Sequence, residues 1–201
     1  MPQKIARIIS IIFHPVLIPT LGLFLLLQSG FYFSMLSWEA KRFILLVVFF
    51  TTGVLPMLSV AILALNPRFD ISMNQTKDRI FPFLSVSVFY YLGFLIMNKI
   101  NAFPVFKIFM IASVLVIIVI LLISFKWKIS AHMAAIGSIT GVFFALSFRS
   151  GVNPVWAILL ALVVSGLIGT ARLLLCKNSL AQVVAGYFTG FFIMYLVVYF
   201  V

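Results

Sequence analysis

The sequence has little charge, and almost none of it is acidic. Of its 201 residues, 8% are charged, with three Asp or Glu against fourteen Lys or Arg. Hydrophobic residues make up 65% of the chain, and the mean hydropathy is +1.29. Soluble domains carry roughly 25% charged and about 45–50% apolar residues. This chain therefore has too little polar surface to coat a water-soluble globule, and we expect an integral membrane protein.

Cysteine and histidine are also scarce. One cysteine, Cys176, excludes an intramolecular disulfide and a cysteine-based metal site. With two histidines and three acids beside it, we expect no metal and no cofactor. The net charge of +11 does not indicate nucleic-acid binding, because the cations stand singly or in pairs between apolar runs, as at the ends of membrane helices. The expected partners are membrane lipids.

Seven apolar stretches come near the roughly 20 residues that a helix needs to cross a bilayer. They are 5–28, 41–65, 80–98, 105–125, 131–148, 154–175 and 180–201. A backbone in lipid must bond to itself, and no alternating pattern suggests a barrel, so these stretches predict helices. The predicted fold class is an all-α polytopic membrane protein: one domain over residues 1–201, with a bundle of six to seven transmembrane helices. We place it in the bacterial cytoplasmic (inner) membrane.

Proline and glycine mark special places in these spans. His14-Pro15 and Pro19 interrupt the hydrogen-bond ladder of the first stretch, so we expect it to be kinked or only partly inserted. His14 is expected to serve helix packing. Glycine pairs one turn apart, Gly137 with Gly141 and Gly186 with Gly190, let helix backbones approach closely in lipid. They predict tight helix contacts.

Polar residues gather at three helix ends that alternation places at one membrane face. These ends are residues 74–82, 126–132 and 171–179. Arg172 stands inside an apolar run, where an ionisable group usually faces the bundle interior and marks a site. Cations, hydroxyl and amide donors and one histidine, His132, favour an anion site, and phosphate is the expected anion. The alternative is that Arg and Lys only reach up to lipid headgroups.

The order and spacing of these residues resemble the type-2 phosphatidic acid phosphatase superfamily, which shares its site with vanadium haloperoxidases. That family's motifs are Lys, six residues, Arg-Pro; then Pro-Ser-Gly-His; then Ser-Arg, five residues, His, three residues, Asp. In this chain the first motif is matched only by residue type, with Lys77, Arg79 and Pro82 at a different spacing. The second motif corresponds to Ile129-Ser130-Ala131-His132. The third corresponds to Ala171-Arg172, five residues, Asn178, three residues, Gln182. The resemblance covers about residues 74–190.

The resemblance implies metal-independent hydrolysis of a phosphate or diphosphate lipid and gives each matching residue a role. The residues that would hold phosphate are Lys77, Arg79, Ser130 and Arg172. His132 would protonate the leaving oxygen. The family's nucleophilic histidine and its orienting aspartate correspond to Asn178 and Gln182.

With Asn178 and Gln182 at these positions, the sequence does not decide whether the protein is an active enzyme, because an amide is not nucleophilic enough to form a phospho-enzyme. The leading interpretation is a lipid-phosphate phosphatase-like protein, hydrolytic if active. His132, counted as the one histidine on this face, could instead activate water or act as nucleophile. One alternative is a catalytically impaired, phospholipid-binding pseudoenzyme. Another is a small transporter or helix-packing subunit, for which the kinked first segment would be the relevant feature.

Overall fold

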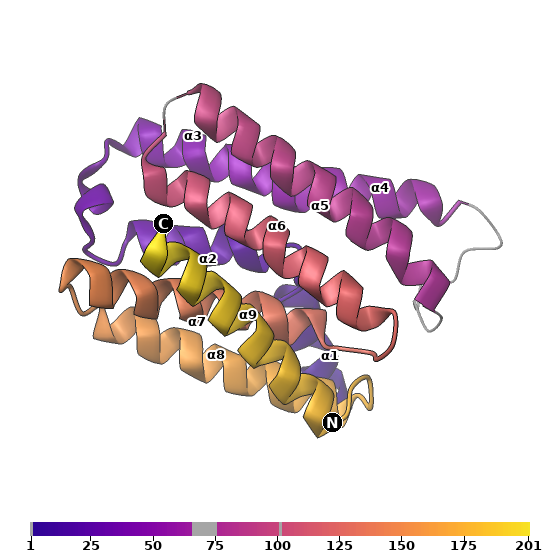
Figure 1. Ribbon diagram of the computed structural model, residues 1–201. Helices are drawn as coiled ribbons and strands as arrows, with labels where there is room; N and C mark the ends of the chain where they lie inside the picture. The colour runs from indigo at the N-terminus through magenta and orange to yellow at the C-terminus, as the bar shows by residue number, and fades with distance from the viewer. Residues whose placement is uncertain (1, 66–75, 101) are drawn as a thin grey trace.

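The structure is a computed structural model that describes residues 2–65, 76–100 and 102–201, with the side chains of residues 76–78 outside that description. The described chain is helical and contains no strand (Figure 1). Its elements are α1 (Pro2–Ile12), α2 (Ile18–Leu27), the 3₁₀ turn η1 (Tyr32–Met35), α3 (Trp38–Val48), the π turn η2 (Phe49–Val54), α4 (Leu55–Leu63), α5 (Thr76–Lys99), α6 (Pro104–Ser124), α7 (Ala131–Ser150), α8 (Val155–Leu174) and α9 (Leu180–Phe200).

Six helices of the described chain are long and apolar enough to cross a membrane. They are the continuous helix Trp38–Leu63, which comprises α3, η2 and α4, followed by Arg79–Lys99, Pro104–Ser124, Ala131–Ser150, Val155–Leu174 and Leu180–Phe200. The predicted all-α polytopic bundle is confirmed, and the protein is a multi-pass membrane protein.

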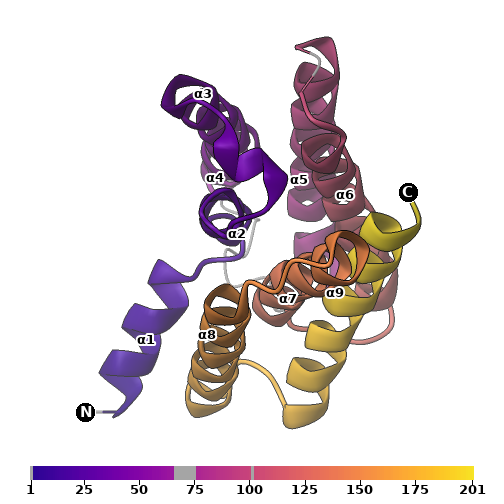
Figure 2. The same cartoon turned by 90° about the vertical axis from the view of Figure 1, so that its left-hand side faces the viewer.

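The first apolar stretch is not one span but two short helices, α1 and α2, with a break between them. Pro15 and Pro19 have no backbone N–H for the helical ladder, and α1 ends at Ile12 before the first of them. The predicted kink is therefore confirmed, while the prediction of one helix over 5–28 is wrong. Beyond the break, α1 leans outward beside α8 (Figure 2).

Helix α7 is the centre of the bundle, and α9 packs closely against it. In α7, 72% of the most apolar window is buried, against 50% or less in the other five spans. A Cβ added at Gly137 of α7 would overlap the carbonyl oxygen of Tyr187 on α9, and one added at Gly190 of α9 would overlap that of Ala134 on α7. The glycine pairs thus face each other, and the predicted close helix contacts are confirmed.

One end of this bundle collects the polar helix termini. Helices α5, α7 and α9 begin there and α8 ends there, which is the arrangement that alternation along the chain predicts. Helix α5 lies beside α6, and α6 packs on α9, so α5 and α6 form a pair above the α7–α9 layer (Figures 1 and 2). The break between α1 and α2 lies against both the α5–α6 pair and α7, since its residues line a cavity together with theirs.

Candidate functional site

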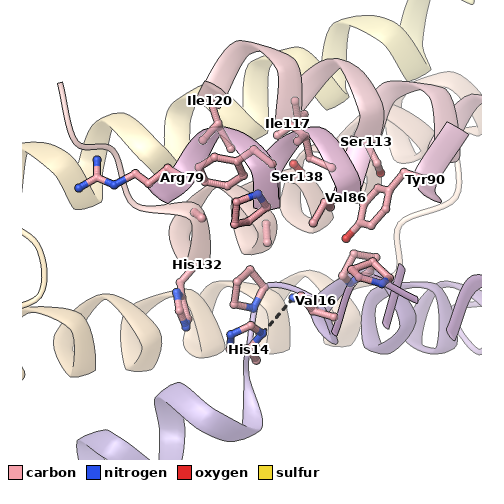
Figure 3. A pocket seen from close by; sticks show the side chains of 18 of the residues that line it. His14, Val16, Arg79, Val86, Tyr90, Ser113, Ile117, Ile120, His132 and Ser138 are labelled. Atoms are coloured by element: carbon pink, nitrogen blue, oxygen red, sulfur yellow. Dashed lines mark hydrogen bonds between the residues drawn. The ribbon is translucent and has the colours of Figure 1, made fainter. Parts of the chain in front are cut away.

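A cavity of about 670 Å³ opens inside the bundle at this polar end (Figure 3). Its walls are the break between α1 and α2, helices α4 to α7, and the turn from α8 to α9. The volume is within the range of roughly 300–1,000 Å³ that small-molecule sites occupy. The polar and charged side chains at its mouth are His14, Arg79, Lys128, His132, Arg172, Lys177 and Asn178.

A tight turn at the end of α8 brings Asn178 back over Arg172. The N–H of Lys177 donates to the carbonyl of Arg172 at 3.2 Å, and Cys176 takes a left-handed conformation with φ of 51°. This is the Schellman arrangement that commonly ends helices, normally with glycine in the left-handed position. Ser179 then caps α9 in a capping box with Gln182. The sequence between the two helices thus fixes where Asn178 lies.

Arg172 reaches the cavity from α8 and has only neutral partners within the described chain. Its Nε donates to Asn178 Oδ1 at 3.1 Å, and its Nη1 donates to Ser10 Oγ at 3.1 Å. No described carboxylate lines the cavity. Arg172 is only partly buried. A partly desolvated cation with neutral partners is stabilised by an anionic ligand.

His132 is held by the broken first segment. Its Nε2 lies 3.3 Å from both the carbonyl oxygen and the hydroxyl oxygen of Ser10. In a continuous helix that carbonyl would accept from the N–H of residue 14, but the chain leaves the helix after Ile12 and the carbonyl accepts from His132 instead. Because a carbonyl only accepts, this bond forms in the tautomer of a neutral His132 that carries the proton on Nε2 and the lone pair on Nδ1.

His14 stands at the break itself and is part of the site rather than a packing residue. It lines the cavity, and its ring lies 5.5 Å from the ring of His132 with the planes 76° apart. Burial, and then the positive charge of Arg172, lower the pKa of His14 below its ordinary value, so its imidazole is neutral at pH 7. Our interpretation of His132 as the one histidine on this face was wrong.

The cations around the mouth repel one another. Lys128 precedes α7, and burial together with the charges of Arg79, Arg172 and Lys177 lowers its pKa from the ordinary value. Arg79, on the first turns of α5, is 9% exposed. Positive groups are therefore crowded and partly desolvated here, a condition that an anion would relieve.

The structure brings together four of the seven residues predicted from the sequence. Arg79, His132, Arg172 and Asn178 line the cavity. Lys77 lies outside the described side chains.

Ser130 and Gln182 do not line the cavity. The Ser130 hydroxyl is buried without a hydrogen-bond partner within the described chain. Gln182 uses its Oε1 locally, accepting from Ser179 N at 3.1 Å and from Asn178 Nδ2 at 3.2 Å.

Sequence reasoning missed Ser10, His14 and Lys128. Ser10 and His14 belong to the first segment, far from the motifs in sequence. The available signal was a titratable side chain placed directly before a proline inside an apolar run. A group of three or more His, Cys, Asp or Glu able to hold a metal ion does not occur among the described residues.

No family model matches the chain, and neither does a curated protein or a solved structure. The resemblance to lipid phosphatases therefore remains a hypothesis drawn from the motifs. The chemistry of the cavity carries the functional conclusion.

Proposed function

We propose that this protein binds the phosphate group of a membrane lipid at the polar end of its cavity. The observation that carries the proposal is that the cations Lys128, Arg172 and Lys177 all line the same cavity. Guanidinium and ammonium groups bind phosphate oxygens through charge-assisted hydrogen bonds, which are stronger than neutral ones. Burial, and then the charges of the neighbouring cations, lowers the pKa of Lys128, and a bound dianion would offset both effects.

The position of Arg172 favours this proposal over simple contact with headgroups at the membrane surface. Its guanidinium is held inside the bundle by Asn178 from the α8–α9 turn and by Ser10 from α1. A guanidinium has five N–H donors, so these two acceptors leave further donors for a ligand. A side chain that only reached the headgroup layer would not need two internal partners.

Binding without efficient turnover is the favoured form of this function. Both ends of the Asn178 amide are engaged, Oδ1 by Arg172 and Nδ2 by Gln182, and an amide is a poor nucleophile. The protein would then be a phosphatase-like lipid-phosphate binder whose catalytic step is impaired. The finer localisation, a bacterial cytoplasmic membrane, belongs to the same proposal; its support is the helical architecture, since outer membranes use barrels.

Metal-independent hydrolysis is the second candidate, and the pairing of His14 with His132 favours it. One imidazole would attack phosphorus or take a proton from water. The other would take up a proton when the anionic phosphate binds and raises its pKa, and would give that proton to the leaving oxygen as the P–O bond breaks. The two rings, 5.5 Å apart, supply the two groups that this division of labour requires.

Binding to a lipid phosphate tests the proposal directly. The purified protein in lipid nanodiscs is titrated with an alkyl phosphate and with the alcohol of the same chain length. Because a hydrogen bond to a charged group contributes about 1.5–3 kcal/mol, Arg172→Gln should weaken alkyl phosphate binding about 10- to 150-fold. Lys107→Gln is the matched control, since Lys107 pairs with Asn98 at the opposite end of the bundle. Equal losses in both variants, or equal affinity for the alcohol, would refute the proposal.

Phosphate release is measured in the same preparation without added metal. Release well above background in the wild-type protein, lost in His132→Ala and in His14→Ala, would favour the second candidate. Binding with no release favours the impaired binder.

A further inference from the structure

Beyond its cationic mouth, the cavity continues as an apolar chamber. Figure 3 shows Arg79 at one end and Tyr90 and Ser113 at the other, with Val86, Ile117 and Ile120 along the way. The chamber walls come from α4, α5, α6 and α7. The lining of the cavity therefore changes from charged side chains at the polar end of the bundle to apolar side chains toward the middle of the membrane.

The serine side chains that line the chamber are already hydrogen-bonded within the protein. The Ser113 hydroxyl donates to the carbonyl of Phe109 at 2.7 Å, and the Ser138 hydroxyl donates to that of Ala134 at 2.9 Å. Tyr90 interacts with the side chain of Thr52. The two serine hydroxyl protons are therefore not available to a ligand, and the largely apolar chamber suits an apolar ligand better than a polar one.

The dimensions of the chamber match one hydrocarbon chain. Arg79 and Tyr90 are eleven residues apart on α5, and at 1.5 Å per residue they are separated by roughly 16 Å along the helix. That depth is about half of the roughly 30 Å hydrocarbon core, the share of one leaflet. If a methylene takes up about as much room as a water molecule, roughly 30 Å³, the cavity of about 670 Å³ holds on the order of twenty non-hydrogen atoms.

We propose that the ligand of this site is a phosphorylated lipid that inserts one chain of roughly 12–16 carbons into the chamber, with its phosphate at Arg172 and Lys128. The inference rests on the proposed function and adds the position and length of the chain. Charge complementarity sets the direction of insertion, because the cations lie at one end only. A second chain has no room in the chamber and stays in the surrounding bilayer.

Crosslinking from the end of the chain tests the position. A single-chain alkyl phosphate with a diazirine at its terminal carbon is bound to the wild-type protein in nanodiscs and photolysed, and the modified residues are mapped by mass spectrometry. Insertion predicts modification at Ser113 or Ile117, which face the chamber from α6. Leu115 and Ile118 on the same helix are each 40% exposed and report a chain that lies outside. Modification confined to these two residues would overturn the proposal.

Chain-length dependence tests the size. The wild-type affinity for alkyl phosphates should rise with length up to roughly 12–16 carbons and then level off. Ser113→Phe adds bulk at the deep end and should move this limit to shorter chains, whereas Ile118→Phe on the outer face should leave it unchanged. An affinity that rises steadily through 18 carbons in all three proteins would show that the chain lies in the bilayer.

The two proposals fail in different ways. If Arg172→Gln weakens binding but the probe marks only the outer residues, the phosphate site stands and the chamber proposal is overturned. If the alcohol probe marks Ser113 or Ile117 as efficiently as the phosphate probe does, and Arg172→Gln changes neither, the chamber takes a chain and the phosphate site is overturned. Should the phosphate probe mark the inner residues and depend on Arg172, both are supported.

Discussion

Placing a histidine at position 178 should give or raise phosphatase activity. In the lipid-phosphatase motif that the chain resembles, a histidine stands at this position with a carboxylate four residues later. Asn178 Nδ2 already lies 3.2 Å from Gln182 Oε1. Because the side-chain nitrogen of asparagine and the Nδ1 of histidine are both attached to Cγ, Nδ1–H of a histidine in Asn178→His should reach the same oxygen. Gln182→Glu keeps the length of the side chain and turns that oxygen into a carboxylate.

Asn178→His should change both the phosphate affinity and the rate of hydrolysis. Asn178→His removes the Oδ1 acceptor of Arg172, whose 3.1 Å bond is worth about 1.5–3 kcal/mol, so phosphate binding should weaken somewhat. General acid–base catalysis by a placed side chain contributes about 10²- to 10⁴-fold. We expect Asn178→His alone to rise above the wild-type rate. Adding Gln182→Glu should give about a further 10- to 100-fold, because a carboxylate orients the imidazole and stabilises its charged form.

The assay is release of inorganic phosphate from an alkyl phosphate in nanodiscs without added metal, run on the wild type, both single variants and the double variant. The effects should be non-additive, with Gln182→Glu alone close to the wild type. A phospho-enzyme that is stable in base and labile in acid should accumulate in Asn178→His. The reasoning is refuted if the double variant binds the alkyl phosphate with wild-type affinity and releases none. It is equally refuted if the wild type hydrolyses rapidly, depends on His132 and gains nothing from the changes.

Three further predictions concern pH, strain and packing. The affinity for an alkyl sulfate, whose charge is constant, should rise as the pH falls below the ordinary histidine pKa of about 6.5. A bound anion raises the lowered pKa of His14, so that binding is coupled to proton uptake. His14→Gln should therefore reduce the dependence of the affinity on pH in a fluorescence titration. Cys176→Gly should stabilise the protein by about 0.5–1 kcal/mol in thermal unfolding, since the strain at φ of 51° exceeds the entropy that glycine costs; no change would contradict this. Gly190→Ala should destabilise it by about 1–3 kcal/mol, because the new methyl group meets the Ala134 backbone, whereas Gly166→Ala, with nothing within 4 Å, should not.

The helices of this protein could be predicted from sequence because lipid leaves the backbone few choices. Apolar length alone located six of the spans, and the glycine pairs Gly137–Gly141 and Gly186–Gly190 indicated where helices approach. The first residue of α5 and the conformation of residues 5–28 were harder to predict. Two prolines in an apolar run are compatible with a kinked span or with two short helices. The outcome depends on which hydrogen-bond partners the backbone groups near the prolines reach in the fold.

The site could be predicted only where its residues share a helix end with an informative neighbour. Arg172 stood out because a cation inside an apolar run needs a partner. Asn178 was predicted from the resemblance to the lipid-phosphatase motif, and the structure shows its contact with Arg172. Gln182 illustrates the limit, since the spacing that suggested a catalytic position also fits a capping box, and the N-terminus of α9 uses it that way. Pattern alone does not decide between two uses of the same spacing.

The break in the first segment connects the fold to the site, and it explains why Ser10 and His14 escaped prediction. Ending α1 at Ile12 leaves the Ser10 carbonyl without its usual helical donor, and His132 takes that place at 3.3 Å. The same residue's hydroxyl accepts from Arg172, so one serine at a helix end joins α1, α7 and α8. A continuous first helix would bond that carbonyl internally and would carry His14 along a straight helix, away from the turn where it meets His132. The prolines are thus as much a part of the candidate site as the cations, because they create the acceptor that His132 uses.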